Sequence, residues 1–200
     1  MFVQSKNVKA SRGINAGKAS SSLKSHLKYI QYRERDEQQE SRQDRHLFSK
    51  EYDHLDRKEA YTDVMAERAG DIYYHRMVLS PADNEPVTDY HRWTRDVMGD
   101  LERHLGTDLH WYATVHKNTD NPHVHIVLRG TGESRETGHL EPVELTPKEF
   151  KLMRESGREH SEQEHYRQLE NVLKELEHLD KAEWMQERDV QHEPEHEFSR

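Results

Sequence analysis

Two segments of alternating polarity impose the strongest constraint on how this chain can fold. LHWYATVH (109–116) and HVHIVLRG (123–130) each alternate like a β-strand, and KNTDNP between them has the composition of a turn. Successive side chains of a strand point to opposite faces, so pairing His116 with His123 gathers the apolar side chains on one face. These are Trp111, Ala113, Val115, Val124, Ile126 and Leu128. We therefore predict a hairpin with one buried face.

The same register brings three histidines together on the opposite face of the hairpin: His116, His123 and His125. The chain has 16 histidines in 200 residues, so an H-x-H pair by itself carries little weight. The stronger observation is that a single register places the apolar side chains on one face and all three histidines on the other. Three imidazoles without a fourth protein ligand describe an open divalent-metal site that keeps positions for water or substrate. Pro122 stiffens the start of the second strand.

The remaining periodicities indicate an α+β fold, an antiparallel sheet with helices packed on its faces and a helical C-terminal extension. We expect helices over 20–35, starting near Ser21 or Ser22, over 53–70, closed by Gly70, and over 87–106. A strand is expected over 72–80, a Gly-rich loop over 130–138 and a short strand near Leu140. Thr146 and Glu149 predict a capping box at the start of a helix that reaches about residue 185. The predicted organisation is one domain over 1–145, a helical extension of it over 146–190 and a disordered tail over 191–200.

Charge is distributed unevenly along the chain. The net charge is −9, yet residues 1–33 contain no Asp or Glu and seven Lys or Arg. We expect this block to be a basic arm, either mobile or following the phosphates of a nucleic acid. The absence of cysteine excludes disulfides and thiolate ligands and fits a reducing compartment. No apolar run approaches the roughly 18 residues of a membrane span, so we expect no membrane insertion and a cytoplasmic protein.

A tyrosine in the basic block is a candidate nucleophile. Tyr29 lies on the only helix predicted within residues 1–33. A phenol can attack a phosphodiester when a metal takes up charge on the non-bridging oxygens, and the product is a phosphotyrosine. Tyr32, three residues along the same helix, could act instead, could act second, or could serve only in packing.

Three stretches together resemble the conjugative relaxases, the mobilisation nucleases of the HUH endonuclease superfamily, in the branch of the enzymes that cut plasmid borders for DNA transfer into plants. HKNTDNPHVHIVLRG (116–130) resembles their third motif, approximately H-x-(D/N)-x-x-x-P-H-x-H before an apolar strand. HLKYIQYR (26–33) is similar to the first motif, with Tyr29 as nucleophile. YHRMVLSP (74–81) resembles the second, which ends in a serine near the DNA, here Ser80.

The resemblance implies a metal-dependent nicking and strand-transfer enzyme acting on single-stranded DNA at an origin of transfer. Mg²⁺ or Mn²⁺ would bind His116, His123 and His125, and Tyr29 would become linked to a 5′-phosphate. It also implies accessory relaxosome proteins and a secretion coupling protein as partners. Many relatives carry an aspartate beside the ligands where this chain has Asn118, so the base for Tyr29 stays unassigned. On charge and proximity alone, Lys24, Lys28 and Arg33 are candidate contacts to the DNA backbone.

Other readings stay open at this stage. Tyr166 follows the histidine motif, as the nucleophile does in replication initiators and transposases of the same superfamily. A three-histidine zinc hydrolase acting on a small molecule would need neither the tyrosines nor the basic block. A non-catalytic DNA-binding protein with a degenerate site would tolerate loss of Tyr29.

Overall fold

The computed structural model describes residues 1–32, 46–117 and 121–190 and confirms the predicted α+β class. The helices are α1 (Ala16–Tyr32), α2 (Arg57–Val64), α3 (Tyr90–Leu105) and α4 (Pro147–Val190), with a short 3₁₀ turn at Ala10–Arg12. The strands are β1 (Phe2–Lys9), β2 (Ile72–Ser80), β3 (Thr107–Asp108), β4 (Trp111–His116), β5 (His123–Arg129), β6 (Thr131–Ser134) and β7 (Leu140–Pro142).

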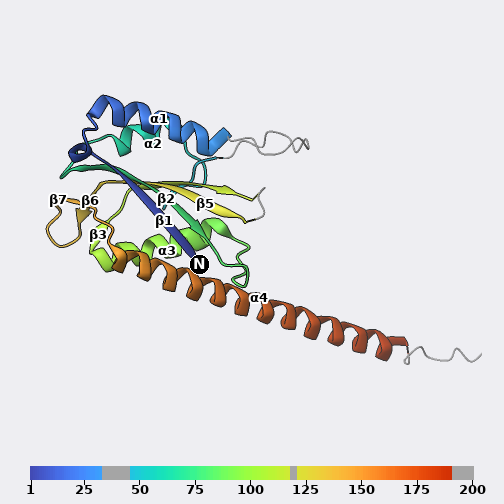
Figure 1. Ribbon diagram of the computed structural model, residues 1–200. Helices are drawn as coiled ribbons and strands as arrows, with labels where there is room; N and C mark the ends of the chain where they lie inside the picture. Colours follow the sequence, from blue (N-terminus) through green and yellow to red (C-terminus); the bar gives the residue numbers. More distant parts are fainter. Residues whose placement is uncertain (33–45, 118–120, 191–200) are drawn as a thin grey trace, which may run out of the picture. The chain divides into compact units, whose positions relative to one another are not determined.

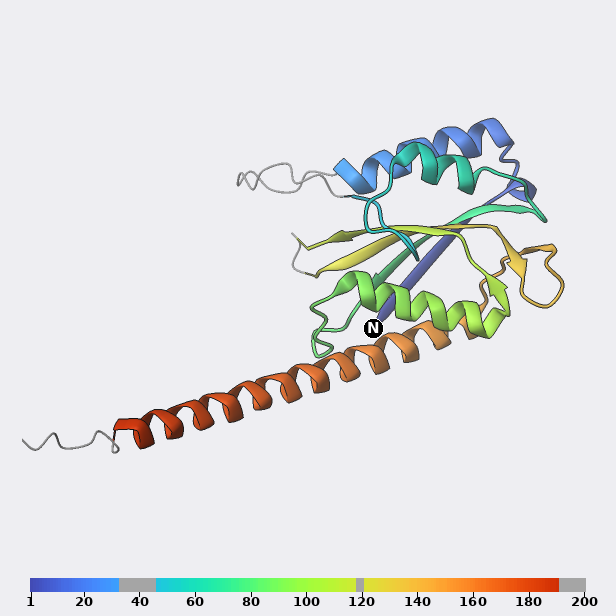
Figure 2. The same cartoon turned by 180° about the vertical axis from the view of Figure 1, so that it is seen from behind.

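A four-stranded antiparallel sheet in the order β1-β2-β5-β4 forms the centre of the fold. Helices α1 and α2 cover one face and α3 covers the other (Figure 1). Each face has its own apolar core, one built around Leu23, Leu27 and Ile30 of α1 and one around Trp93 and Trp111. The strands β3, β6 and β7 form a separate small sheet. The same layers are seen from behind in Figure 2.

The predicted register of the hairpin is confirmed. His116 pairs with His123, and the ladder continues to Trp111 opposite Leu128. Trp111, Ala113, Val124, Ile126 and Leu128 lie in the core on the α3 side, and Val115 is partly buried against it. The three histidines lie on the other face, toward α1. The apolar pattern of this hairpin therefore determined both its register and its orientation in the sheet.

The start of the chain is not a free arm, so of the two alternatives for residues 1–33 the mobile arm is wrong. Residues 2–9 form β1, which pairs antiparallel with β2 from Phe2 opposite Ser80 to Lys9 opposite Ile72. In β1 only Val8 is buried, whereas most residues of β4 are, so β1 contributes little buried apolar surface to the sheet. Its pairing comes from backbone hydrogen bonds supplied by β2, which sequence periodicity does not reveal.

The bounds of α1 and α2 also differ from the prediction. Helix α1 begins at Ala16, before Ser21 and Ser22, and the Asn15 side chain accepts a hydrogen bond from the Lys18 N–H at 2.9 Å. Helix α2 covers only Arg57–Val64 of the predicted 53–70, because Asp56 and Glu59 form a capping box that begins it and Met65 ends it. Gly70 therefore lies outside the helix.

Other local signals agree with the structure. Gly106 ends α3 with a left-handed φ of 65°, and Thr146 and Glu149 bond at the start of α4 as a capping box would.

The segment 130–138, predicted as a Gly-rich loop, instead contains β6. Gly130 is required there because a Cβ would collide with the carbonyl group of Ile72.

The chain divides into two compact units, Met1–Glu162 and Gln163–Arg200. Within the first unit, the Trp93 indole donates to the Gly157 carbonyl at 2.8 Å, and the Ser161 hydroxyl donates to the Pro86 carbonyl at 3.1 Å. The beginning of α4 thus belongs to the first unit. The predicted tail, 191–200, lies outside the described residues. Among the described helices none combines the length and the apolar character needed to cross a membrane.

A polar cluster joins α2 to the hairpin. The Asp63 carboxylate accepts from the Tyr112 hydroxyl at 3.0 Å and lies 3.2 Å from His110 Nδ1 and 3.4 Å from an Arg129 nitrogen. Burial would raise the pKa of Asp63, but hydrogen bonds led by that of His110 lower it. The hydrogen bond to Asp63 in turn raises the pKa of His110 above its ordinary 6.5.

This cluster predicts a pH dependence of stability. Because the pKa of His110 is raised in the folded protein, its contribution is complete below the ordinary histidine pKa and is lost as the pH rises through the raised value. His110→Asn should therefore flatten the decline of unfolding free energy between about pH 6 and pH 8. Urea unfolding at several pH values across this range measures the slope of unfolding free energy against pH, with the exposed His139→Asn as control. Equal slopes in wild type and His110→Asn would contradict the assignment.

The packing of α1 predicts a second effect on stability. Leu27 is 1% exposed beneath α1, so Leu27→Ala should cost about 2–5 kcal/mol of unfolding free energy through reduced burial and the cavity left behind. Ser25→Ala, on the exposed side of the same helix, should stay within about 0.5 kcal/mol of wild type. Urea denaturation compares the two variants, and similar losses for both would refute this account of α1.

Candidate active site

The end of the hairpin carries a compact group of three imidazoles. His116 ends β4, while His123 and His125 begin β5 on the same face of the sheet. Their ring centroids lie 4.6 to 5.2 Å apart, and one potential ligand atom from each lies within 4.8 Å of the others. His116 is buried and the other two are half-buried. The predicted convergence of the histidines is confirmed, and we call this group the histidine triad.

Backbone carbonyls orient two of the three rings. His123 Nδ1 lies 2.8 Å from the Asn121 carbonyl, and His116 Nε2 lies 2.6 Å from the Ile30 carbonyl. A carbonyl can only accept, so these ring nitrogens donate and the opposite nitrogen of each neutral ring carries the lone pair. Such hydrogen bonds are typical of histidines that bind a metal. His123 Nε2 accordingly faces His125 Nε2 at 3.2 Å.

Helix α1 presents Tyr29 to the triad. Ile30, which accepts the bond from His116, lies in the last turn of α1, where carbonyls lack partners within the helix. This bond attaches the end of α1 to the end of β4. The adjacent Tyr29 ring meets His125 edge to face at a centroid distance of 6.4 Å, and Tyr29 is 42% exposed. Tyr29 is therefore both next to the triad and accessible to a large substrate.

The other two candidate tyrosines have different surroundings. Tyr32 is 54% exposed, and the Arg57 guanidinium lies 4.8 Å from its ring. Tyr32 also lines a pocket, together with His46 and His54. Tyr166 is 67% exposed on α4 in the second compact unit. Within the described part of the chain, Tyr29 is the one of the three whose ring meets a triad histidine.

The predicted DNA contacts are spread more widely. Lys24 and Lys28 are both exposed on α1, and the Lys24 ammonium lies 4.8 Å from the Tyr61 ring. Ser80 ends β2 beside the triad, and its hydroxyl donates to the Pro122 carbonyl at 3.2 Å, immediately before His123. Arg33 and Asn118 lie outside the described residues.

Sequence reasoning missed one histidine of the site. His26 lies one turn before Tyr29, with ring centroids 6.3 Å from Tyr29 and 6.4 Å from His125. Burial, and then the nearby Arg76 charge, lower the pKa of His26 to about 4, so it is neutral at neutral pH. Its Nε2 is buried without a hydrogen-bond partner in the described part of the chain. The sequence signal that could have identified His26 was its position three residues before Tyr29, because residues at this spacing are neighbours on a helix surface.

Together these groups can perform metal-assisted chemistry on a large anionic substrate. The triad offers three nitrogen ligands and leaves coordination positions for oxygen atoms of a substrate. The phenol of Tyr29 lies at the edge of the same site. The Tyr29 phenol and the three imidazoles thus share one end of the sheet, beside the last turn of α1.

Comparisons with known proteins bear on this geometry. Residues 29–139 match the family described as "Relaxase: MobA/VirD2-like, nuclease domain", a span that runs from Tyr29 through the triad. No curated protein matches the sequence. A chain solved in a study of the molecular basis of vancomycin resistance transfer in Staphylococcus aureus is similar at 15% identity and a TM-score of 0.43, covering 84% of this chain and 92% of that chain.

The family match covers more than half of the chain and contains the hairpin, the histidine triad and Tyr29. On this match, the chain belongs to the MobA/VirD2-like relaxases and carries their nuclease domain.

Proposed function

We propose that the protein nicks one strand of DNA at an origin of transfer and holds the cut end as a 5′-phosphotyrosine on Tyr29. The observation that carries this proposal is the contact between the Tyr29 ring and His125, with α1 attached to the triad through the His116–Ile30 bond. A DNA endonuclease of the relaxase family is what the family match supports by itself. The nucleophile, the covalent intermediate and the metal are added by this proposal.

The chemistry balances without an external energy source. The Tyr29 oxygen attacks the scissile phosphorus and loses its proton, the bond from phosphorus to the 3′ oxygen breaks, and that oxygen leaves as a 3′-hydroxyl after taking up a proton. The phosphotyrosine keeps the phosphodiester free energy. Attack by a 3′-hydroxyl on the same phosphorus reverses these steps and rejoins a strand, which gives strand transfer.

The triad fits a divalent cation. Two of its rings are held by backbone carbonyls, and the ligand atoms converge within 4.8 Å. Mg²⁺ and Mn²⁺ prefer oxygen ligands, so phosphate and water oxygens would complete a site with three imidazoles, as an open site requires. A bound ion would neutralise charge on the non-bridging oxygens of the scissile phosphate.

Side chains around the triad would position Tyr29 and the backbone of β5 and would contact the DNA. The contact with His125 holds Tyr29 at the site, and Ser80 fixes the backbone before His123. Lys24 and Lys28 are proposed contacts to the DNA backbone, on charge and position. In the donor cytoplasm, accessory relaxosome proteins and a secretion coupling protein would act with the enzyme.

Metal binding is the first test. Mutation of a triad residue, as in His123→Ala, should weaken Mn²⁺ binding by about tenfold or more, because a directly coordinating nitrogen is removed. Isothermal titration of metal-free protein with Mn²⁺ measures this. The exposed His139→Ala serves as a histidine control and should bind like wild type. Unchanged affinity in His123→Ala would exclude the triad as the metal site.

The nucleophile is tested with labelled single-stranded DNA of the transfer origin, in Mn²⁺ or in EDTA. We expect a covalent adduct on a denaturing gel for wild type, Tyr32→Phe and Tyr166→Phe in Mn²⁺, and none for Tyr29→Phe, which keeps the ring but lacks the oxygen. EDTA should abolish every adduct. Loss only in Tyr166→Phe would instead indicate a replication initiator or transposase. With Mn²⁺ binding intact, absence of any adduct would favour a hydrolase or a binding protein.

A further inference from the structure

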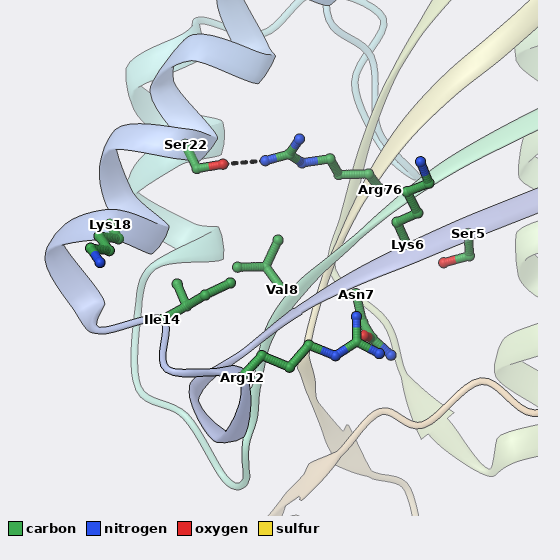
Figure 3. Close-up of a pocket in the computed structure, with 9 residues that line it drawn as sticks. All are labelled: Ser5, Lys6, Asn7, Val8, Arg12, Ile14, Lys18, Ser22 and Arg76. Carbon is green, nitrogen blue, oxygen red and sulfur yellow. Dashed lines mark hydrogen bonds between the residues drawn. The ribbon is translucent and has the colours of Figure 1, made fainter.

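A basic pocket lies beside β1, at the opposite end of α1 from Tyr29. It has a volume of about 630 Å³ and is formed by β1, the turn that follows it, the first turns of α1 and Arg76 of β2 (Figure 3). Four of its lining residues are cationic: Lys6, Arg12, Lys18 and Arg76. We call it the edge-strand pocket, because β1 is the end strand of the four-stranded sheet.

The positive charge of the pocket is not neutralised by the described part of the protein. No carboxylate lines it, and within the described residues none of its four cations forms a salt bridge with an acidic side chain. The Arg76 guanidinium donates to the Ser22 hydroxyl and, at 3.1 Å, to the Tyr74 hydroxyl, while its Nε is buried without a partner in that same part of the chain. A half-buried cation held only by neutral groups favours an anionic ligand. The local excess is notable in a chain of net charge −9.

The register of the sheet places two of these cations on the face that carries the histidine triad. Lys6 pairs with Arg76, Arg76 with Val127, and Val78 with His125. Directly opposed residues share a face, and residues two apart along a strand do so as well. Lys6 and Arg76 therefore lie one row of side chains, about 7 Å along the strands, from the row of His125.

Helix α1 connects the two sites along the same face. Ser22, which contacts Arg76, precedes Tyr29 by seven residues, so about 10 Å of helix separates them along its axis. A single strand with its scissile phosphate beside Tyr29 could extend along α1 to the edge-strand pocket within a few nucleotides.

The chemical nature of the lining indicates which part of a strand would enter. Among the described residues that line the pocket none is aromatic, and the apolar ones are Val8 and Ile14. Proteins hold unpaired bases mainly by stacking them on aromatic rings, and hold the backbone with Lys and Arg. The pocket is thus suited to phosphate groups rather than to bases.

We propose that the edge-strand pocket binds a backbone phosphate of the strand whose scissile phosphate lies at the histidine triad, an inference that rests on the proposed function. The pocket would fix the position of the strand along α1 and contribute affinity independent of sequence. It is a second anchoring point, separate from the cleavage chemistry.

The test measures binding of the full-length chain to a fluorescein-labelled oligothymidylate in EDTA, by anisotropy over a range of salt concentrations. The variant is Arg12→Ala with Lys18→Ala, and the charge-matched control is Arg154→Ala with Lys148→Ala. Lys18 and Lys148 are both exposed lysines in the first turn of a helix, and Arg154 is exposed on α4. Both pairs remove two positive charges from the chain, so a difference between them reports position and not net charge.

We expect the pocket variant to bind the oligonucleotide roughly tenfold more weakly at low salt, and the control to match wild type. The salt slope of the pocket variant should be smaller by about 0.7 for each phosphate that it no longer binds. Equal binding by the two variants would overturn the pocket while leaving the proposed function intact. Failure of wild type to bind the oligonucleotide would overturn the sequence-independent anchoring proposed for the pocket, while the adduct test with transfer-origin DNA decides the proposed function separately. Binding of ATP that disappears in the pocket variant, with oligonucleotide affinity unchanged, would assign the pocket to a free nucleotide and reject the proposal.

Discussion

The register of β4 against β5 is the constraint on which the rest of the site depends. Side chains alternate with a period of two, so a slip of β5 by one residue against β4 would turn His123 and His125 into the core and Ile126 out of it. The apolar face therefore enforces the geometry of the polar face. Burial of Ile126 and its neighbours is what keeps the histidines together, although no apolar side chain needs to touch a metal ligand for this to hold.

The attachment of α1 converts this hairpin into a site with a nucleophile. Leu23, Leu27 and Ile30 pack the helix on the sheet, and the His116–Ile30 bond places its last turn over the triad. One hydrogen bond thus orients a ligand ring and satisfies a carbonyl at the end of a helix. Tyr29 and His26 follow from that placement, because they share the last turns of α1 with Ile30.

The α1 face of the sheet carries a local excess of positive charge, although the chain as a whole is negatively charged. Several acidic groups away from this face have basic or polar partners, such as Glu102 with Lys50 and Asp100 with His160. The cations around the edge-strand pocket have no acidic partner among the described residues. A protein of negative net charge can therefore present a local positive surface to DNA, since within a Debye length the nearest charges dominate.

The sequence by itself determined the hairpin, its register and the meeting of His116, His123 and His125, because strand periodicity is a local property that both faces report at once. The helix caps at Gly106 and Thr146 could likewise be predicted from the sequence, since capping involves residues within one turn of each other. Only the tertiary structure decided that residues 2–9 join the sheet, since the pairing partner of β1 lies some 70 residues away. The same holds for His26 beside His125 and for Lys6 beside Arg76. These contacts are set by which strand and which helix lie side by side, and no local pattern in the sequence encodes that choice.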